Sequence, residues 1–354
     1  MFLLTFFIKE LNILYILRLF IIQKKFSIKC LLVRFFFVKL IISIQIELKP
    51  IYIFLMNIFT KNRYIFDGGM GQTLIDKGMI SKGTLWSATA LVDESLNHLV
   101  LDSHLDFINS GAEVIVTSNF KVRKNTFIEN AIIDRFDFAN RMAGELAFNA
   151  KIKSNKNILI AGSLPTRGIT YQPHFDYDEN LIFDEFHQVA NELNPFVDFF
   201  YLDVLSSIKE ITTALNSIKD FNKPSLLGLY FRKNFLLPSG ETIEDVVNAI
   251  KKFNVVGLMA SCVSPEIYQG IQLSLKKQNL PFGFAVNAFI DIPDKIPLDE
   301  NFSAQPNKYL GLRKEITPKV FTQFAIDSLN NGAKFLKGCC NILPKHIEFL
   351  NKTL

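Results

Sequence analysis

The chain carries the stretch KFLKGCC at residues 334–340. The stretch begins as a short, largely apolar run and ends in a glycine followed by two adjacent cysteines. Short apolar runs that end in small or polar residues, and that alternate with longer stretches of helical spacing, are typical of the βα units of a parallel sheet. Residues 334–338 therefore predict a buried parallel strand, with two thiols just beyond its carboxyl end.

Seven earlier runs follow the same pattern, so the sequence predicts eight strands from Tyr64 onward. The runs are Tyr64–Asp67, Glu113–Thr117, Ile158–Ser163, Phe199–Asp203, Ser225–Tyr230, Val255–Ala260, Pro281–Val286 and Lys334–Gly338. Amphipathic helices are predicted at Leu96–Ser110, Asn125–Ile152, Phe183–Leu193, Thr242–Phe253 and Pro318–Asn331. Eight such units that close on themselves form a (β/α)8 TIM barrel, which we expect to be a single domain.

An open, doubly wound sheet is the alternative architecture. It would need a glycine-rich phosphate-binding turn at the start of its first helix. Residues 67–71, with the sequence DGGMG, are only superficially similar, because the turn begins with an acid that would repel phosphate. We therefore favour the barrel.

Three of the four cysteines lie just after predicted strands: Cys262 after the sixth, and Cys339 and Cys340 after the eighth. The active site of a barrel of this kind lies at the carboxyl ends of its strands, so the three thiols should converge. Adjacent cysteines form a poor disulfide, whereas zinc binds thiolates in tetrahedral geometry, and three protein ligands leave one position for substrate. We predict a catalytic zinc site, against the alternative of three small buried hydrophobic side chains.

The net charge of +5 is unevenly distributed. Residues 1–55 contain eight basic and two acidic residues, which gives this segment +6 and the remainder −1. A near-neutral body without a basic stripe argues against nucleic-acid binding. The few cysteines argue against a secreted disulfide framework and favour the reducing cytoplasm.

Residues 1–55 differ in composition from the rest of the chain, being rich in Phe, Ile, Leu and Lys and lacking glycine. Basic residues interrupt each apolar run before it reaches the roughly 20 residues of a transmembrane helix, so no span is expected. The segment also lacks the features of a signal or transit peptide, although an amphipathic interfacial anchor stays open. We expect Met56 to be the working start and residues 56–354 to form the barrel.

The chain resembles the homocysteine S-methyltransferases from about Tyr64 to its end. The resemblance rests on residues 66–74, 85–87, 111–115, 161–165, 262–265 and 338–347, and most specifically on the glycine-Cys-Cys motif with its upstream cysteine. That family is similar to betaine-homocysteine methyltransferase and to the homocysteine-binding barrel of methionine synthase. The resemblance implies a zinc held by Cys262, Cys339 and Cys340, which presents homocysteine as a thiolate to a small sulfonium or betaine methyl donor and yields methionine.

The same resemblance implies a site for the amino acid end of homocysteine. Asp67 and an acid after the fourth strand would hold the amino group, with the backbone of Gly68 and Gly69 nearby. Asp203 matches that acid, although the family usually has Glu-Thr there. The other departures are Lys337, in place of the first of two glycines before the cysteines, and Ala260-Ser261, where a Val-Asn pair commonly stands.

Three further residues are weaker candidates for substrate contact. Trp86 is the single tryptophan, and aromatic faces can hold the positive charge of a sulfonium or quaternary ammonium donor. Arg167 follows the third predicted strand, and Asn287 follows the seventh, where the resembling family places an asparagine. Both residues should lie at the carboxyl-terminal rim of the barrel, where the active site is expected.

Two other functions stay open. Asp203, Lys337 and Ser261 raise the possibility of a non-catalytic barrel that binds zinc or thiols, and the acceptor of an active enzyme could be another small thiol or a selenol. The residues identify neither the methyl donor nor the oligomeric state.

Overall fold

The computed structural model describes residues 58–173, 178–295 and 306–354. The predictions for residues 1–55 lie outside these residues. The strands are β1 Tyr64–Ile65, β2 Val114–Val116, β3 Leu159–Pro165, β4 Phe199–Leu205, β5 Ser225–Leu229, β6 Val255–Val263, β7 Phe282–Val286 and β8 Phe335–Gly338. The α-helices are α4 Met70–Asp76, α5 Thr89–Val92, α6 Asn97–Asn109, α7 Lys124–Glu129, α8 Phe136–Ser154, α9 Glu179–Leu193, α10 Ile208–Ile218, α11 Ile243–Ile250, α12 Pro265–Lys276, α14 Pro306–Leu310, α15 Pro318–Asn330 and α16 Pro344–Thr353.

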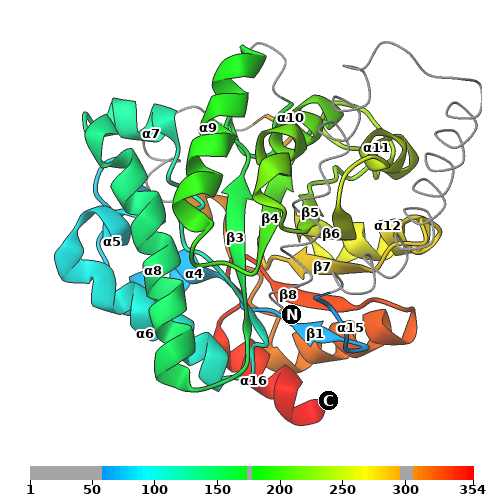
Figure 1. Cartoon of the computed structure of the whole chain (residues 1–354). Helices are drawn as coiled ribbons and strands as arrows, with labels where there is room; N and C mark the ends of the chain where they lie inside the picture. The colour runs from blue at the N-terminus through cyan, green and yellow to red at the C-terminus, as the bar shows by residue number, and fades with distance from the viewer. Residues whose placement is uncertain (1–57, 174–177, 296–305) are drawn as a thin grey trace, which may run out of the picture. The chain divides into compact units, whose positions relative to one another are not determined.

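The strands form one parallel sheet in the order β1-β8-β7-β6-β5-β4-β3-β2. The ends of this order meet, because Phe66 pairs with Val114 in a parallel bridge and the Glu113 amide donates to the Ile65 carbonyl. The sheet is therefore closed, and the helices surround it (Figure 1). This arrangement confirms the predicted (β/α)8 barrel.

Aromatic side chains fill the amino-terminal end of the barrel. The ring of Phe59 lies 5.2 Å from that of Phe199 and 4.8 Å from that of Phe335, measured between centroids. Phe199 and Phe335 are the first residues of β4 and β8, so the packing closes the bottom of the barrel. We therefore expect the polar residues of a functional site at the opposite, carboxyl-terminal end of the barrel.

All eight predicted strands form, but the prediction of a single helix over Asn125–Ile152 was wrong. The chain breaks there into α7 and α8, with Ala131 in the left-handed conformation at a φ of 54°. The Asn130 side chain donates to the Thr126 carbonyl and to the Thr84 hydroxyl, which stabilises the break. Helical spacing of apolar residues does not reveal such local side-chain bonds.

Two strands are longer than predicted and contain bulges. The register of β4 against β5 shifts between Leu202 and Leu205, and that of β6 against β7 shifts between Ser261 and Val263. Val204 and Cys262 lie at these shifts with φ values of 62° and 54°. Cys262 thus lies within a strand rather than after it, and Asp203 is no longer the last residue of its strand. The bulges determine where the two side chains point.

No helix within the described ranges is long and apolar enough to cross a lipid bilayer.

Candidate metal centre

A cavity of about 120 Å³ lies at the carboxyl ends of the strands. It brings together all of the predicted site residues except Arg167 and Asn287. Its lining includes Asp67, Gly68, Gly69, Trp86, Asp203, Cys262, Cys339 and Cys340, together with Phe120, Tyr171, Ser261 and Lys337. The cavity is small, so it suits a small molecule beside the three thiols.

The three cysteine sulfurs lie within 4.8 Å of one another. The Sγ atoms of Cys262 and Cys340 are 3.9 Å apart. Two thiolates bound to one tetrahedral zinc at about 2.3 Å would be separated by about 3.8 Å. The donor set and its spacing therefore fit a single metal ion with three sulfur ligands.

Cys262 is held in position by its bulge and by two neighbouring side chains. Asn287 donates from Nδ2 to the Cys262 carbonyl at 2.7 Å, and the same nitrogen lies 3.8 Å from Sγ. The Tyr171 hydroxyl lies 3.2 Å from Sγ. Asn287 and Tyr171 thus contact the backbone and the sulfur of Cys262, and these contacts orient this candidate metal ligand.

Cys339 and Cys340 are held by backbone bonds to neighbouring strands. The Cys339 amide donates to the Val286 carbonyl at the end of β7, and the Cys340 carbonyl accepts from the Ala288 amide. The Gly338 amide donates to the Asp67 carbonyl after β1. The pair is therefore attached to the strand ends on both sides of β8.

Gly68 and Gly69 pack directly against the cysteine turn. A Cβ atom on Gly68 would lie 2.2 Å from the Ile342 carbonyl oxygen, and one on Gly69 would lie 2.8 Å from the Cys339 carbonyl oxygen. Both contacts are with backbone atoms, which cannot move aside as a flexible side chain can. The two glycines therefore have a packing role in addition to lining the cavity.

The surroundings shift the pKa values of the three thiols in different directions. Burial acts to raise the pKa of Cys262, but hydrogen bonds from Cys339, Cys340 and Tyr171 outweigh it and lower the pKa well below its usual range. The pKa values of Cys339 and Cys340 are raised by their hydrogen bonds to Cys262 and by burial. The hydrogen bonds of the cluster therefore centre on the Cys262 sulfur.

Asp67 forms a buried ion pair with Lys337. Its Oδ1 lies 2.5 Å from the Lys337 Nζ, and its Oδ2 accepts from the Val116 amide at 2.7 Å. Burial raises the pKa of Asp67, and the lysine ammonium and the Val116 amide oppose that rise. In the sequence, Lys337 is only a departure from the family pattern and is not among the predicted site residues.

Asp203 is the second carboxylate of the cavity. Its oxygens accept from the hydroxyls of Ser163 and Ser261, both at 3.3 Å. Burial raises its pKa to about 7, and nearby Cys262 adds to the rise while Lys337 opposes it. Its contacts are longer than those of Asp67, so Asp203 is the less tightly bound carboxylate.

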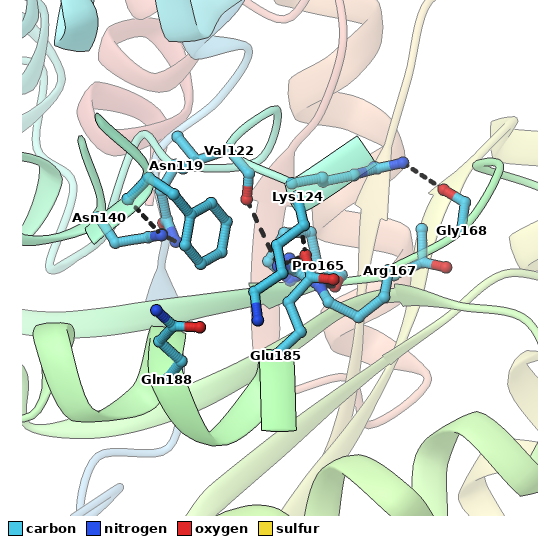
Figure 2. A network of polar contacts seen from close by, with 12 residues as sticks. Asn119, Val122, Lys124, Asn140, Pro165, Arg167, Gly168, Glu185 and Gln188 are labelled. Carbon is cyan, nitrogen blue, oxygen red and sulfur yellow. Dashed lines mark hydrogen bonds and ion pairs between the residues drawn. The ribbon is translucent and has the colours of Figure 1, made fainter. Parts of the chain in front are cut away.

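The predicted substrate contact of Arg167 is not supported by its position. The side chain is buried in the wall outside the cavity, where Nε donates to the Pro165 carbonyl and Nη1 lies 3.1 Å from Glu185 of α9 (Figure 2). The guanidinium also lies over the ring of Phe186 on α9, so it faces the helix layer. We assign Arg167 a structural role in packing α9 on the barrel.

Trp86 and Asn287 occupy different places. Trp86 is 8% exposed and lines the cavity, with its ring against Gly71. Asn287 lines an adjacent cavity of about 530 Å³, and among the described residues its link to the three thiols is Cys262. Tyr171 follows the third strand as Arg167 does, so the sequence predicts it at the rim of the barrel, but its contact with the Cys262 sulfur was not predicted.

Fold and site together define a class: a (β/α)8 barrel with a three-thiol metal centre at its active rim. A family model described as homocysteine S-methyltransferase matches residues 64–354. The chain therefore belongs to the homocysteine S-methyltransferase family, which confirms the resemblance seen in the sequence.

Curated relatives and a solved structure agree with this assignment. Homocysteine S-methyltransferase 2 of Saccharomyces cerevisiae is 22% identical over 317 residues, which cover 81% of this chain and 93% of that protein. Selenocysteine methyltransferase of Astragalus bisulcatus is 22% identical over 324 residues, which cover 82% of this chain and 92% of that protein. The metallated form of the homocysteine methyltransferase MmuM from Escherichia coli matches with a TM-score of 0.69 at 18% identity, covering 83% of this chain and 97% of that one. At that identity the structural match supports the fold.

Proposed function

We propose that the protein transfers a methyl group from a small donor to the thiol of homocysteine and so produces methionine. The observation that carries this proposal is the convergence of Cys262, Cys339 and Cys340 within 4.8 Å beside a small cavity, in a chain of this family. The substrates are then two small molecules, the acceptor thiol and the methyl donor.

We propose zinc as the metal. Three thiolate ligands in tetrahedral spacing favour zinc over magnesium or calcium, which prefer oxygen ligands. Zinc, when bound, would deprotonate a coordinated thiol at neutral pH. The thiols have to stay reduced to bind a metal, which is compatible with the cytoplasmic location that we also propose.

In the proposed reaction the acceptor sulfur forms a bond to the methyl carbon while the bond from that carbon to the donor breaks. The donor leaves as a neutral sulfide or amine, and the thiol proton passes to solvent. A donor of this kind carries a positive charge on sulfur or nitrogen. The aromatic residues Trp86, Phe120 and Tyr171 line the cavity and support a cationic donor, because aromatic faces attract cations.

We propose that the polar end of the acceptor lies in the part of the cavity lined by Asp67, Asp203 and the Gly68-Gly69 turn. These residues line the same cavity as the three sulfurs, so one small thiol could contact both groups. Asp203 has the longer protein contacts and is the carboxylate better able to accept from a substrate ammonium.

A related acceptor is the second candidate function. The relative from Astragalus bisulcatus is named for methylation of selenocysteine, so a selenol acceptor has support from one comparison. A barrel that binds zinc and thiols without turnover is the remaining alternative.

The test is detection of methionine by mass spectrometry after incubation of zinc-loaded protein with homocysteine and one donor at a time. The donors are S-methylmethionine, S-adenosylmethionine, betaine and dimethylsulfoniopropionate. We expect methionine from at least one donor, with loss of both product and bound zinc in Cys339→Ser. Cys30→Ser, which changes the fourth cysteine, is the matched control and should retain both.

Zinc-loaded protein that gives no methionine with any donor would contradict the proposed reaction. Selenohomocysteine and selenocysteine, assayed with the same donors, would then distinguish a selenol methyltransferase from a binding module.

A further inference from the structure

Lys337 places a fixed positive charge inside the cavity. Its side chain is on β8, two residues before Cys339, and it is 6% exposed. Within the described residues, Nζ makes one close hydrogen bond, to Asp67 Oδ1 at 2.5 Å. An ammonium group has three N–H donors, so two remain for a molecule in the cavity.

The ion pair also limits the hydrogen bonds that Asp67 can accept from a substrate. Each of its oxygens already accepts a hydrogen bond from the protein, Oδ1 from Lys337 and Oδ2 from the Val116 amide. Both bonds are short, at 2.5 and 2.7 Å, and the carboxylate is 1% exposed. A substrate ammonium would have to compete with a lysine ammonium that is tethered in place.

We propose that Lys337 determines acceptor specificity by binding the acid group of the acceptor, so that this protein selects short thiols by their carboxylate more than by their amino group. The ammonium of Lys337 occupies the place against Asp67 that a substrate amine would otherwise take. A charge-assisted hydrogen bond from the lysine to a carboxylate in this enclosed cavity is stronger than a bond between neutral groups. The proposal rests on the proposed function, because it assumes that a thiol acceptor enters this cavity.

Two analogues of homocysteine separate the contributions of its charged groups. 4-Mercaptobutanoate keeps the carboxylate and lacks the amine, whereas 3-aminopropane-1-thiol keeps the amine and lacks the carboxylate. Cobalt(II) in place of zinc provides a readout that does not depend on turnover, because binding of a fourth thiolate changes the charge-transfer absorption band that the three cysteine thiolates give. Titration of each thiol into cobalt-loaded protein gives its Kd.

In the wild-type protein we expect 4-mercaptobutanoate to bind within a few-fold of homocysteine. 3-Aminopropane-1-thiol should bind roughly tenfold or more weakly, the effect of losing one hydrogen bond to a charged group. Tighter binding of the amine than of 4-mercaptobutanoate would overturn the proposal and assign recognition to Asp203. This comparison uses the native chain, so it does not depend on the folding of a variant.

Lys337→Met removes the charge and keeps a side chain of similar length. We expect the preference between the two analogues to reverse, because Asp67 is then free for a substrate amine. Lys345→Met, which removes an exposed lysine near the start of α16, is the matched control and should keep the wild-type preference. An unchanged preference in folded Lys337→Met would contradict the proposal.

Different results would contradict the proposed function and the proposed role of Lys337. If the thiols bind cobalt-loaded protein but zinc-loaded protein makes no methionine with any donor, the proposed function is wrong, and the order of the Kd values still tests the role of Lys337. If methionine forms but the analogues show the preference for the amine, the enzyme assignment stands and the role of Lys337 is wrong.

Discussion

At the scale of single residues, the site depends on contacts that orient the cysteine sulfurs. Tyr171 approaches the Cys262 sulfur from a loop after β3, and Asn287 holds the Cys262 backbone from the end of β7. Both residues lie outside the group of three cysteines that could hold a metal ion. Their positions indicate that the metal affinity of the cluster depends on its neighbours as well as on its thiols.

We expect Tyr171→Phe to weaken zinc binding by roughly tenfold, the size of effect typical of a lost contact to a metal ligand. The substitution removes the hydroxyl 3.2 Å from the sulfur and keeps the ring. Zinc affinity can be measured by competition with a chromophoric chelator. Tyr230→Phe is the control, because this ring packs 4.7 Å from that of Tyr171 but its hydroxyl has no hydrogen bond to the sulfurs in the described structure. Equal affinities for both variants would contradict the role of Tyr171.

His104 predicts a pH dependence of stability. The ring is fully buried in α6, and neither nitrogen has a hydrogen-bond partner among the described residues. Burial, aided by the charge of Lys337, lowers its pKa from 6.5 to about 3. A base with a lowered pKa contributes stability above pH 6.5 that is lost as the pH falls toward 3, by about 1.4 kcal/mol per pH unit.

We expect His104→Leu to reduce the loss of unfolding free energy between pH 7 and pH 5 by roughly 2 kcal/mol. Urea unfolding at the two pH values measures the difference. His98→Leu, an exposed change on the same helix, is the control. The idea fails if both variants lose as much stability as the wild type.

At the scale of elements, the site is assembled where two turns touch. The Gly68-Gly69 turn after β1 packs on the turn that carries Cys339 and Cys340 after β8. The Gly69 amide donates to the Ile342 carbonyl at 2.8 Å, which fixes the separation of the two turns. The first and last strands of the chain therefore meet to form one side of the site.

Gly68→Ala should separate these turns, because its Cβ would lie 2.2 Å from the Ile342 carbonyl oxygen. We expect a loss of stability of about 1–3 kcal/mol, typical of overpacking, together with weaker zinc binding. Thermal unfolding and metal content measure the two effects. Gly78→Ala is a control for the metal effect, because no atom lies within 4 Å of its added Cβ, although its φ of 96° adds strain. Wild-type zinc affinity in Gly68→Ala would show that the contact does not position the cysteines.

At the scale of the whole molecule, residues Phe59–Leu354 form one compact unit. Residues 64–354 are those matched by the family model. Our prediction that Met56 is the working start remains to be tested, and so does the boundary between residues 1–55 and 56–354.

A protein that starts at Met56 should fold and bind one zinc ion per chain. It retains Phe59, which packs against Phe199 and Phe335 at the amino-terminal end of the barrel. A protein that starts at Tyr64 loses this ring and should be less stable by about 3–5 kcal/mol. Circular dichroism during thermal unfolding compares the two. Failure of the Met56 protein to fold would show that the preceding residues are needed.

Much of the fold was predictable from the sequence because strands buried on both faces appear as continuous apolar runs. The positions of the eight strands and the convergence of the thiols follow from those runs and from the geometry of parallel barrels. The bulges in β4 and β6 were not predictable, because a left-handed conformation at Val204 or Cys262 has no signal in the residue type. The orientation of Arg167 was missed because it depends on Glu185, a partner on α9 that is 18 residues further along the chain.

The sequence by itself determined the barrel, the three thiols and the family, since each depends on local patterns or on motifs in order along the chain. Only the tertiary structure decided what surrounds the thiols. It brought Lys337 of β8 to Asp67 after β1 and turned Arg167 away from the cavity. These are contacts between residues far apart in the sequence, and their distances and burial arise only when the sheet closes.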